Sequence, residues 1–212
     1  MRKWSISTLI LAATASATLA AQEPHIGAGI NLIIPTGGFS SSTYAANGSV
    51  MSPQKETYDI GLGGQFTISF PMDPHVAFRL DLFGQTENGT NRAEGYETIN
   101  LRHQLFGIGG TIQLFPGNGS AYRQRGLYFL GGLSADFERF GYSHGDPDYD
   151  YTDTTNKSRM GLRVGLGHIF GYGGGPRFSV EGLYHTSLTG HNADNGEPPS
   201  TDYVQLGFGW VF

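Results

Sequence analysis

Three side chains near the C-terminal end of the chain are of types that could carry out nucleophilic catalysis. His185 and Ser187 are two positions apart in a segment that alternates between apolar and polar residues, and side chains at i and i+2 of a strand lie on the same face. A histidine within reach of a serine hydroxyl can act as its general base, and Glu197 follows as a candidate acid. These residues could therefore form a hydrolytic site; the alternative is an inert polar pair that faces inward.

A second group of candidates consists of charged residues on one face of several alternating segments. Its members are Arg79, Asp81, Arg102, Arg163 and Glu181, with Asp136 and Glu138 as further candidates. If these side chains face the inside of one barrel, each buried charge needs a partner. A narrow eight-stranded interior is just wide enough for side chains, which favours a plug of ion pairs. A gated polar pore is the alternative.

A third candidate is the acidic segment 141–157. It contains Asp146, Asp148, Asp150 and Asp153, and the Asp-x-Asp-x-Asp spacing could offer oxygen ligands to a hard cation. The segment lacks the central glycine and distal glutamate of an EF-hand loop. We therefore expect a solvated acidic loop, with no metal site and no cofactor.

The N-terminal residues predict secretion. Arg2 and Lys3 precede a charge-free, apolar or small-residue stretch from Ile6 to Leu19, which is typical of a signal peptide. We place the signal peptide at residues 1–21 and the mature domain at residues 22–212. Without Arg2 and Lys3, 11 basic residues remain against 18 acidic ones, a formal charge of -7. A nucleic-acid partner is therefore not expected.

The rest of the chain alternates with a period of two and shows no sustained helical period, so all-β structure is predicted. The alternating segments are residues 25–36, 58–70, 75–85, 99–115, 127–140, 159–170, 177–188 and 203–212. The segment 99–115 changes phase near Leu105 and Phe106, which predicts a β-bulge. Long and short connections alternate between the segments, as in an eight-stranded antiparallel up-and-down transmembrane barrel with both termini in the periplasm.

The two faces of each segment differ in polarity. One is apolar and almost free of charge at mid-strand, and the other carries glycine and charges of both signs, so we expect the apolar face to point outward into lipid. Aromatic residues near the segment ends predict two interfacial girdles. They are Phe70, Phe115, Phe170, Phe178 and Phe212 at one end, and Tyr58, Phe83, Phe137, Phe140, Tyr184 and Tyr203 at the other.

The C-terminal residues resemble the assembly signal of outer-membrane proteins. Gln205, Gly207, Trp210 and Phe212 match its pattern of a polar residue, a glycine and two aromatic residues, the last one terminal. With the signal peptide and the strand number, the mature chain resembles the small OmpA/OmpX-type barrels. The resemblance implies a Gram-negative outer membrane, insertion by the barrel assembly machinery, and a monomer in contact with outer-membrane lipid and lipopolysaccharide.

The spacing of His185 and Ser187 is similar to the His-x-Ser of the outer-membrane lipid A 3-O-deacylases. Leu188 stands where that family usually has asparagine, and the predicted register points both side chains into the lumen. We therefore expect a non-enzymatic barrel with a structural or surface-interaction role through its extracellular loops. A deacylase-like hydrolase and a narrow pore are the alternatives.

Overall fold

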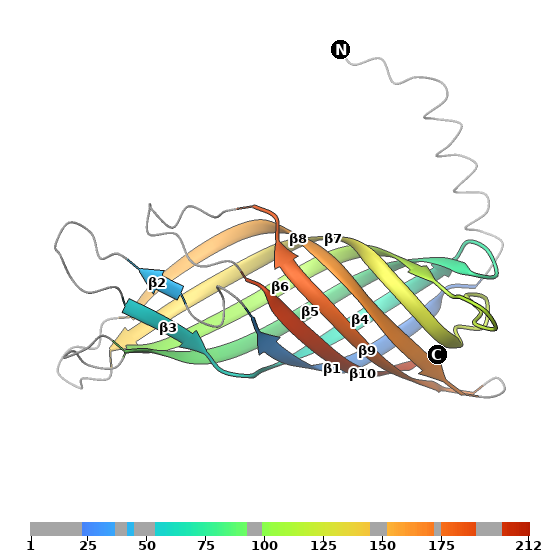
Figure 1. The fold of residues 1–212 in the computed structure, drawn as a ribbon, viewed down its shortest axis with the longest axis horizontal. Coiled ribbons are helices and arrows are strands. Elements are labelled where there is room, and N and C mark those ends of the chain that lie inside the picture. Colours follow the sequence, from blue (N-terminus) through green and yellow to red (C-terminus); the bar gives the residue numbers. More distant parts are fainter. Residues whose placement is uncertain are drawn as a thin grey trace, which may run out of the picture.

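The computed structural model describes residues 23–36, 42–44, 54–92, 99–144, 152–171, 175–189 and 201–212. Ten strands lie in these ranges, and eight of them form a closed barrel of strongly tilted strands (Figure 1). Their bounds are β1 His25–Pro35, β2 Ser42–Tyr44, β3 Gln54–Tyr58, β4 Gly61–Pro71, β5 Val76–Arg92, β6 Ile99–Leu114, β7 Gly126–His144, β8 Thr152–Phe170, β9 Arg177–Ser187 and β10 Tyr203–Val211. No helix in the described part of the chain is long and apolar enough to span a membrane. The predicted signal peptide lies outside these residues.

Eight of the strands build the barrel wall. β1 pairs with both β4 and β10, every further neighbour pair is antiparallel, and the β5–β6 pairing completes the ring. The prediction of eight antiparallel strands is thus confirmed. The backbone N–H of Phe212 donates to the carbonyl of Ile26 at 2.8 Å, so the first and last strands meet at the same end of the barrel.

One hairpin, formed by β2 and β3, was not predicted. The predicted segment 58–70 is interrupted, because β3 ends at Tyr58 and β4 begins at Gly61. β3 pairs with the far end of β5, with Lys55 opposite Arg92, and β2 pairs with β3. This short hairpin extends the sheet at the end that carries the long connections (Figure 1).

The barrel wall has two heights. β1, β4, β9 and β10 have 9 to 11 residues, about the number that crosses a bilayer when tilted. β5 to β8 have 16 to 19 residues and continue past the ends of their shorter neighbours (Figure 1). Much of the predicted loops 86–97 and 141–157 is therefore strand: we call residues 86–92, 99–104, 139–144 and 152–158 the raised wall.

The predicted β-bulge near Leu105 is absent. The pairing of β6 with β5 runs without interruption from Ile99 opposite Asn91 to Leu114 opposite Val76, and its pairing with β7 is equally continuous. The apolar side chains change face instead: Leu101 and Leu105 are buried inside, whereas Phe106 and Ile108 point outward. The phase change therefore marks the edge of the lipid-facing band. Beyond this edge the outside is polar, and Leu101 and Leu105 face the interior.

Below that edge the outer face is a continuous apolar band, as predicted. None of its outward positions on the eight wall strands is Asp, Glu, Lys or Arg. The girdle assignment was wrong in part. Phe70, Phe137, Phe170, Phe178, Tyr184 and Phe212 lie on the outer face, but Tyr58, Phe83, Phe115, Phe140 and Tyr203 are buried inside.

Glycine makes room for these interior rings. An added Cβ at Gly107 would collide with the ring of Phe83, and one at Gly167 would collide with the ring of Tyr128. Each glycine faces inward on the strand next to the one that carries the ring: Gly107 on β6 beside β5, and Gly167 on β8 beside β7. The high glycine content, 33 of 212 residues, therefore reflects in part the packing of large side chains in a narrow lumen.

The band edge can be tested with a single added charge. Leu133 lies on the outer face at mid-strand in β7, so Leu133→Arg should destabilise the barrel by about 2–4 kcal/mol. Gln104→Arg, above the edge, should cost no more than about 1 kcal/mol. Urea unfolding in lipid vesicles would measure both. Equal losses for the two variants would contradict this position of the edge.

Candidate functional site

The candidate site is the buried charge network in the half of the lumen near the chain termini. Its centre is Arg79 of β5, only 4% exposed. The guanidinium donates to both carboxylate oxygens of Glu181 on β9, from Nη1 at 2.5 Å and from Nη2 at 3.1 Å. Its Nε lies 2.9 Å from Oδ1 of Asp81. Arg79 thus links two carboxylates from opposite parts of the wall.

Three further side chains complete this network. The Tyr128 hydroxyl donates to Oε2 of Glu181 at 2.7 Å, and Nη1 of Arg163 lies 3.2 Å from Oδ2 of Asp81. The Arg163 guanidinium also lies over the Phe83 ring, 4.2 Å from its centroid. Two arginines and two carboxylates, all buried, give the network a balanced formal charge. Four of the five expected lumen charges therefore lie together.

The fifth was placed wrongly. Arg102 is exposed on the outer face of β6, because the expected bulge does not exist and the register continues unchanged through Leu105. Its position belongs to the raised wall, above the apolar band. Arg102 is therefore not part of the lumen network.

A second set of buried ionisable side chains lies nearer the raised wall. His185 Nε2 lies 2.9 Å from Asp136 Oδ2, Arg159 Nε lies 3.1 Å from Glu138 Oε2, and His103 Nδ1 lies 2.7 Å from Glu87 Oε2. Sequence reasoning missed Glu87, His103 and Arg159. Glu87 lies beyond the predicted end of its strand. The expected bulge gave His103 the wrong face. Arg159 was not selected, although its position is inward. Extending the alternation along longer strands would have found all three.

Apolar side chains fill much of the remaining lumen. One cluster lies in the half toward the raised wall and contains Ile33, Tyr58, Phe83, Leu101, Leu105, Phe140 and Tyr203. The other lies toward the termini and contains Ala77, Phe115, Ala121, Tyr128, Leu130, Ile169, Leu183 and Val211. Two rings of the first cluster pack against histidine rings: Tyr203 stacks on His185 with the centroids 4.5 Å apart, and Phe140 is tilted against His103 with the centroids 4.7 Å apart.

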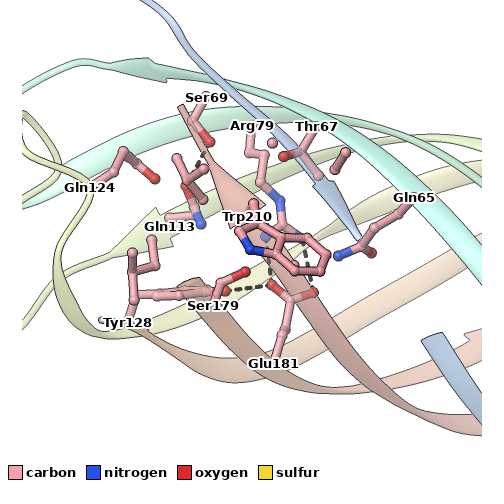
Figure 2. Close-up of a pocket in the computed structure, with 15 residues that line it drawn as sticks. Gln65, Thr67, Ser69, Arg79, Gln113, Gln124, Tyr128, Ser179, Glu181 and Trp210 are labelled. Atoms are coloured by element: carbon pink, nitrogen blue, oxygen red, sulfur yellow. Dashed lines mark hydrogen bonds and ion pairs between the residues drawn. The ribbon is translucent and has the colours of Figure 1, made fainter. Parts of the chain in front are cut away.

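A small cavity adjoins the Arg79 network. Figure 2 shows the Arg79 guanidinium and the Tyr128 hydroxyl converging on Glu181, with Gln113 and Ser69 on another side of the space. Ser69 Oγ donates to Gln113 Oε1 at 3.2 Å. The cavity has a volume of about 20 Å³, enough for about one water molecule. It is polar but too small for a larger ligand.

His185 and Ser187 point into the lumen, as their register predicted. β9 pairs continuously with β8 and β10, so no bulge turns them toward lipid. Both ring nitrogens of His185 have partners other than Ser187, since Nδ1 lies 3.1 Å from the carbonyl oxygen of Thr201 and Nε2 contacts Asp136. The Ser187 hydroxyl hydrogen-bonds the hydroxyl of Thr201, which donates to Glu138 at 2.6 Å. Glu197 lies outside the described residues.

The residues of the expected assembly signal occupy both faces of β10. Gln205 is buried inside and its Nε2 donates to Gln65 at 2.9 Å; Gly207 is also inward, where a Cβ would lie 2.9 Å from Asn31 Oδ1. Trp210 is exposed on the outer face, with its ring 6.2 Å from that of Phe178. Phe212 is exposed as well. Two aromatic side chains are therefore accessible at the outer surface of the last strand.

The acidic segment 141–157 is described only at its ends. Residues 145–151 lie outside the described part of the chain, and with them Asp146, Asp148 and Asp150; Asp153 is in β8, but its side chain is not described. Within the residues that the structure does describe, no group of three His, Asp or Glu side chains could hold a metal ion.

The chain was compared with protein-family models, curated proteins and solved structures. A sequence model of the outer membrane protein beta-barrel domain matches residues 6–212, whereas no curated protein sequence matches the chain. The structure is similar to the outer membrane protein OprG from Pseudomonas aeruginosa, with a TM-score of 0.58 and 15% identity over 90% of this chain and 96% of that one. It is also similar to Ail of Yersinia pestis in complex with the heparin analogue sucrose octasulfate, with a TM-score of 0.53 and 10% identity over 89% and 97% of the two chains.

The Arg79 network can be tested through stability. Arg79→Ala should destabilise the barrel by about 3–5 kcal/mol, because it leaves two carboxylates buried without their main partner. Arg139→Ala removes an exposed arginine and should change stability by no more than about 0.5 kcal/mol. Both can be measured by urea unfolding in the same lipid vesicles. If the two variants lose equal stability, the ion pairs of Arg79 do not stabilise the barrel.

Proposed function

Since the chain belongs to the family of outer membrane protein beta-barrel domains, we propose that this outer-membrane barrel is non-enzymatic, with a closed lumen and a surface-interaction role for its raised wall and outer loops. The observation that carries the proposal is the connected network of Arg79, Asp81, Arg163 and Glu181 across the lumen. The strands supply a rigid support, and the end that rises out of the membrane supplies the contact surface.

The closed lumen follows from the energetics of the network. Ions could pass only if side chains moved out of the way, and separating a buried arginine from its carboxylates costs several kcal/mol. The apolar clusters on either side of the charges fill further space in the lumen. The space beside Arg79 has a volume of about 20 Å³, which holds about one water molecule and does not form an aqueous channel.

The surroundings of His185 and Ser187 support the hypothesis that the barrel is non-enzymatic. Both side chains are buried, His185 completely and Ser187 at 5% exposure. A lipid ester would have to enter the packed lumen to meet the serine, and His185 already contacts Asp136 and Thr201. A general base must reach the proton that it removes. The arrangement suits polar packing better than acyl transfer.

The raised wall is the surface that we propose for interactions. Its outer face is polar: Asn88, Asn100, Arg102, Arg139 and Asn156 are all exposed. Arg102 and Arg139 are diagonal neighbours, because Gln104 pairs with Arg139 and Arg102 with Gly141. Arg139 is the next outward residue of β7 above Phe137, and Arg102 lies two outward positions above Phe106 on β6. Two guanidiniums above an apolar band suit the phosphate groups of lipopolysaccharide.

Assembly in the membrane is proposed to depend on the last strand. Trp210 and Phe212 are exposed at the outer surface, where the barrel assembly machinery could read them before β10 pairs with β1. Because that pairing closes the ring, the wall leaves no unpaired edge strand for a second copy. We therefore propose that the mature protein is a monomer.

The closed lumen predicts little conductance. Purified protein in planar bilayers should show no steady channel current, whereas Arg79→Ala with Glu181→Ala, which removes the central ion pair, should show brief openings. Ser187→Ala should match the wild type in conductance and in the absence of fatty-acid release from lipopolysaccharide. A large, stable wild-type current would contradict the plug, and fatty-acid release lost in Ser187→Ala would contradict the non-enzymatic reading.

The proposed lipopolysaccharide contact predicts a charge dependence. Arg102→Gln with Arg139→Gln should weaken binding of lipopolysaccharide to the detergent-solubilised protein by about fivefold for each arginine removed. Titration followed by native mass spectrometry would measure the affinity. The matched control, Arg123→Gln with Arg125→Gln, removes the same charge at the opposite end and should leave this affinity unchanged. An unchanged affinity in the first variant would remove the assigned contact.

A further inference from the structure

A basic cleft lies at the opposite end of the barrel, beside the chain termini. Two adjoining spaces of about 360 Å³ each share Arg125 and Gly171 among the residues that line them. One is also lined by Tyr122, Arg123 and Arg177. The other is also lined by Leu127, His168 and Phe170 of the outer face. We call the two spaces together the periplasmic cleft.

The β6–β7 connection, part of which lines this cleft, is held by backbone hydrogen bonds. Ser120 and Arg125 form two backbone hydrogen bonds, at 2.9 and 3.1 Å, and the N–H of Ala121 donates to the carbonyl of Pro74 at 2.8 Å. Ala121 and Gln124 are almost completely buried. The connection between β6 and β7 therefore folds back over the end of the lumen and presents Arg123 and Arg125 at a fixed place.

Two other strand ends hold the same connection. The Arg177 guanidinium, at the start of β9, donates to the carbonyl of Arg123, and His25 Nε2 at the start of β1 lies 3.0 Å from the carbonyl of Tyr122. Three arginines are thus brought to one cleft by β9 and the β6–β7 connection. The connection 115–125 contains no acidic residue, although the mature chain has a formal charge of -7.

The cleft joins this positive charge to the lipid-facing surface. Leu127 and Phe170 line it, and they are 41% and 48% exposed on the outer face. His168 also lies on that face, and its ring centroid is 4.3 Å from that of Phe170. It is a polar side chain at the end of the apolar band. A free anion would need only the arginines. A molecule that fits both parts must carry an anionic head and acyl chains.

We propose that the periplasmic cleft binds an anionic glycerophospholipid of the periplasmic leaflet. Its phosphate lies against Arg123 and Arg125, because guanidiniums form charge-assisted hydrogen bonds with phosphate oxygens. Its acyl chains lie along Leu127, Phe170 and the outer face of β7 and β8. The site is at the opposite end from the proposed lipopolysaccharide contact, and each can fail without the other.

Native mass spectrometry of the detergent-solubilised protein tests the site. We expect phosphatidylglycerol to bind at least about fivefold more tightly than phosphatidylethanolamine, and Arg123→Gln with Arg125→Gln to lose about fivefold for each arginine removed. The matched control is Arg102→Gln with Arg139→Gln, which should keep wild-type affinity for phosphatidylglycerol. A heat-dependent gel shift would verify that each variant is folded. Arg177 is left in place because it supports the connection.

The remaining arms separate lipid from other anions. Glycerophosphoglycerol, which has the head group without acyl chains, and inorganic phosphate should both bind far more weakly than the intact lipid, and Phe170→Ala should weaken binding of the intact lipid only. If inorganic phosphate or an acidic peptidoglycan fragment binds as tightly as the lipid, the lipid assignment is overturned. Equal binding of the two phospholipids, or equal losses in the two double variants, overturns the site itself.

Discussion

The fold depends on one constraint: within hydrocarbon, each backbone N–H and C=O must be paired inside the protein. The sheet meets it by closing, as β1 pairs with β10 along its length from Gly27 opposite Val211 to Pro35 opposite Tyr203. Closure with eight strands fixes a narrow interior. Alternation then sends every second side chain into that interior, whatever its size or charge. Glycine opposite large rings and arginine between carboxylates are the two ways in which this sequence fills the space.

The same constraint explains where sequence reasoning succeeded and where it failed. Alternation identified eight segments and the inward parity of Arg79 and Glu181, because a period of two is imposed along the whole length of a strand. It failed at Leu105 because we read the apolar face as the outer face throughout. Hydrocarbon covers only part of β5 to β8. Above it the solvent is outside, so Arg102 turns to water while Leu101 and Leu105 pack inside, without any change of register.

Partners in the lumen could not be predicted from parity alone. Arg79 binds Glu181, which is 102 residues away along the chain, and the choice depends on strand stagger and on the space left by neighbouring side chains. Asp81 is shared by Arg79 and Arg163, whereas Asp136 contacts His185. The partners of His185 support the proposed non-enzymatic role, and spacing in sequence cannot show them. His185 and Ser187 share one strand face, but His185 contacts Thr201 and Asp136, and Ser187 hydrogen-bonds Thr201.

Charge is excluded from the apolar band, so the ionisable residues of the described wall sort into the lumen and the two rims. In the lumen the arginines must be matched by carboxylates, since an unpaired buried charge is costly. At the rims water and lipid head groups solvate charge, and no such balance is required. The exposed arginines Arg102 and Arg139 at one rim and Arg123 at the other therefore need no buried carboxylate partner, whereas Arg79 does. Stability accounts for the pairing of the lumen charges, and the exposed rim arginines are the residues on which we base the proposed lipid contacts.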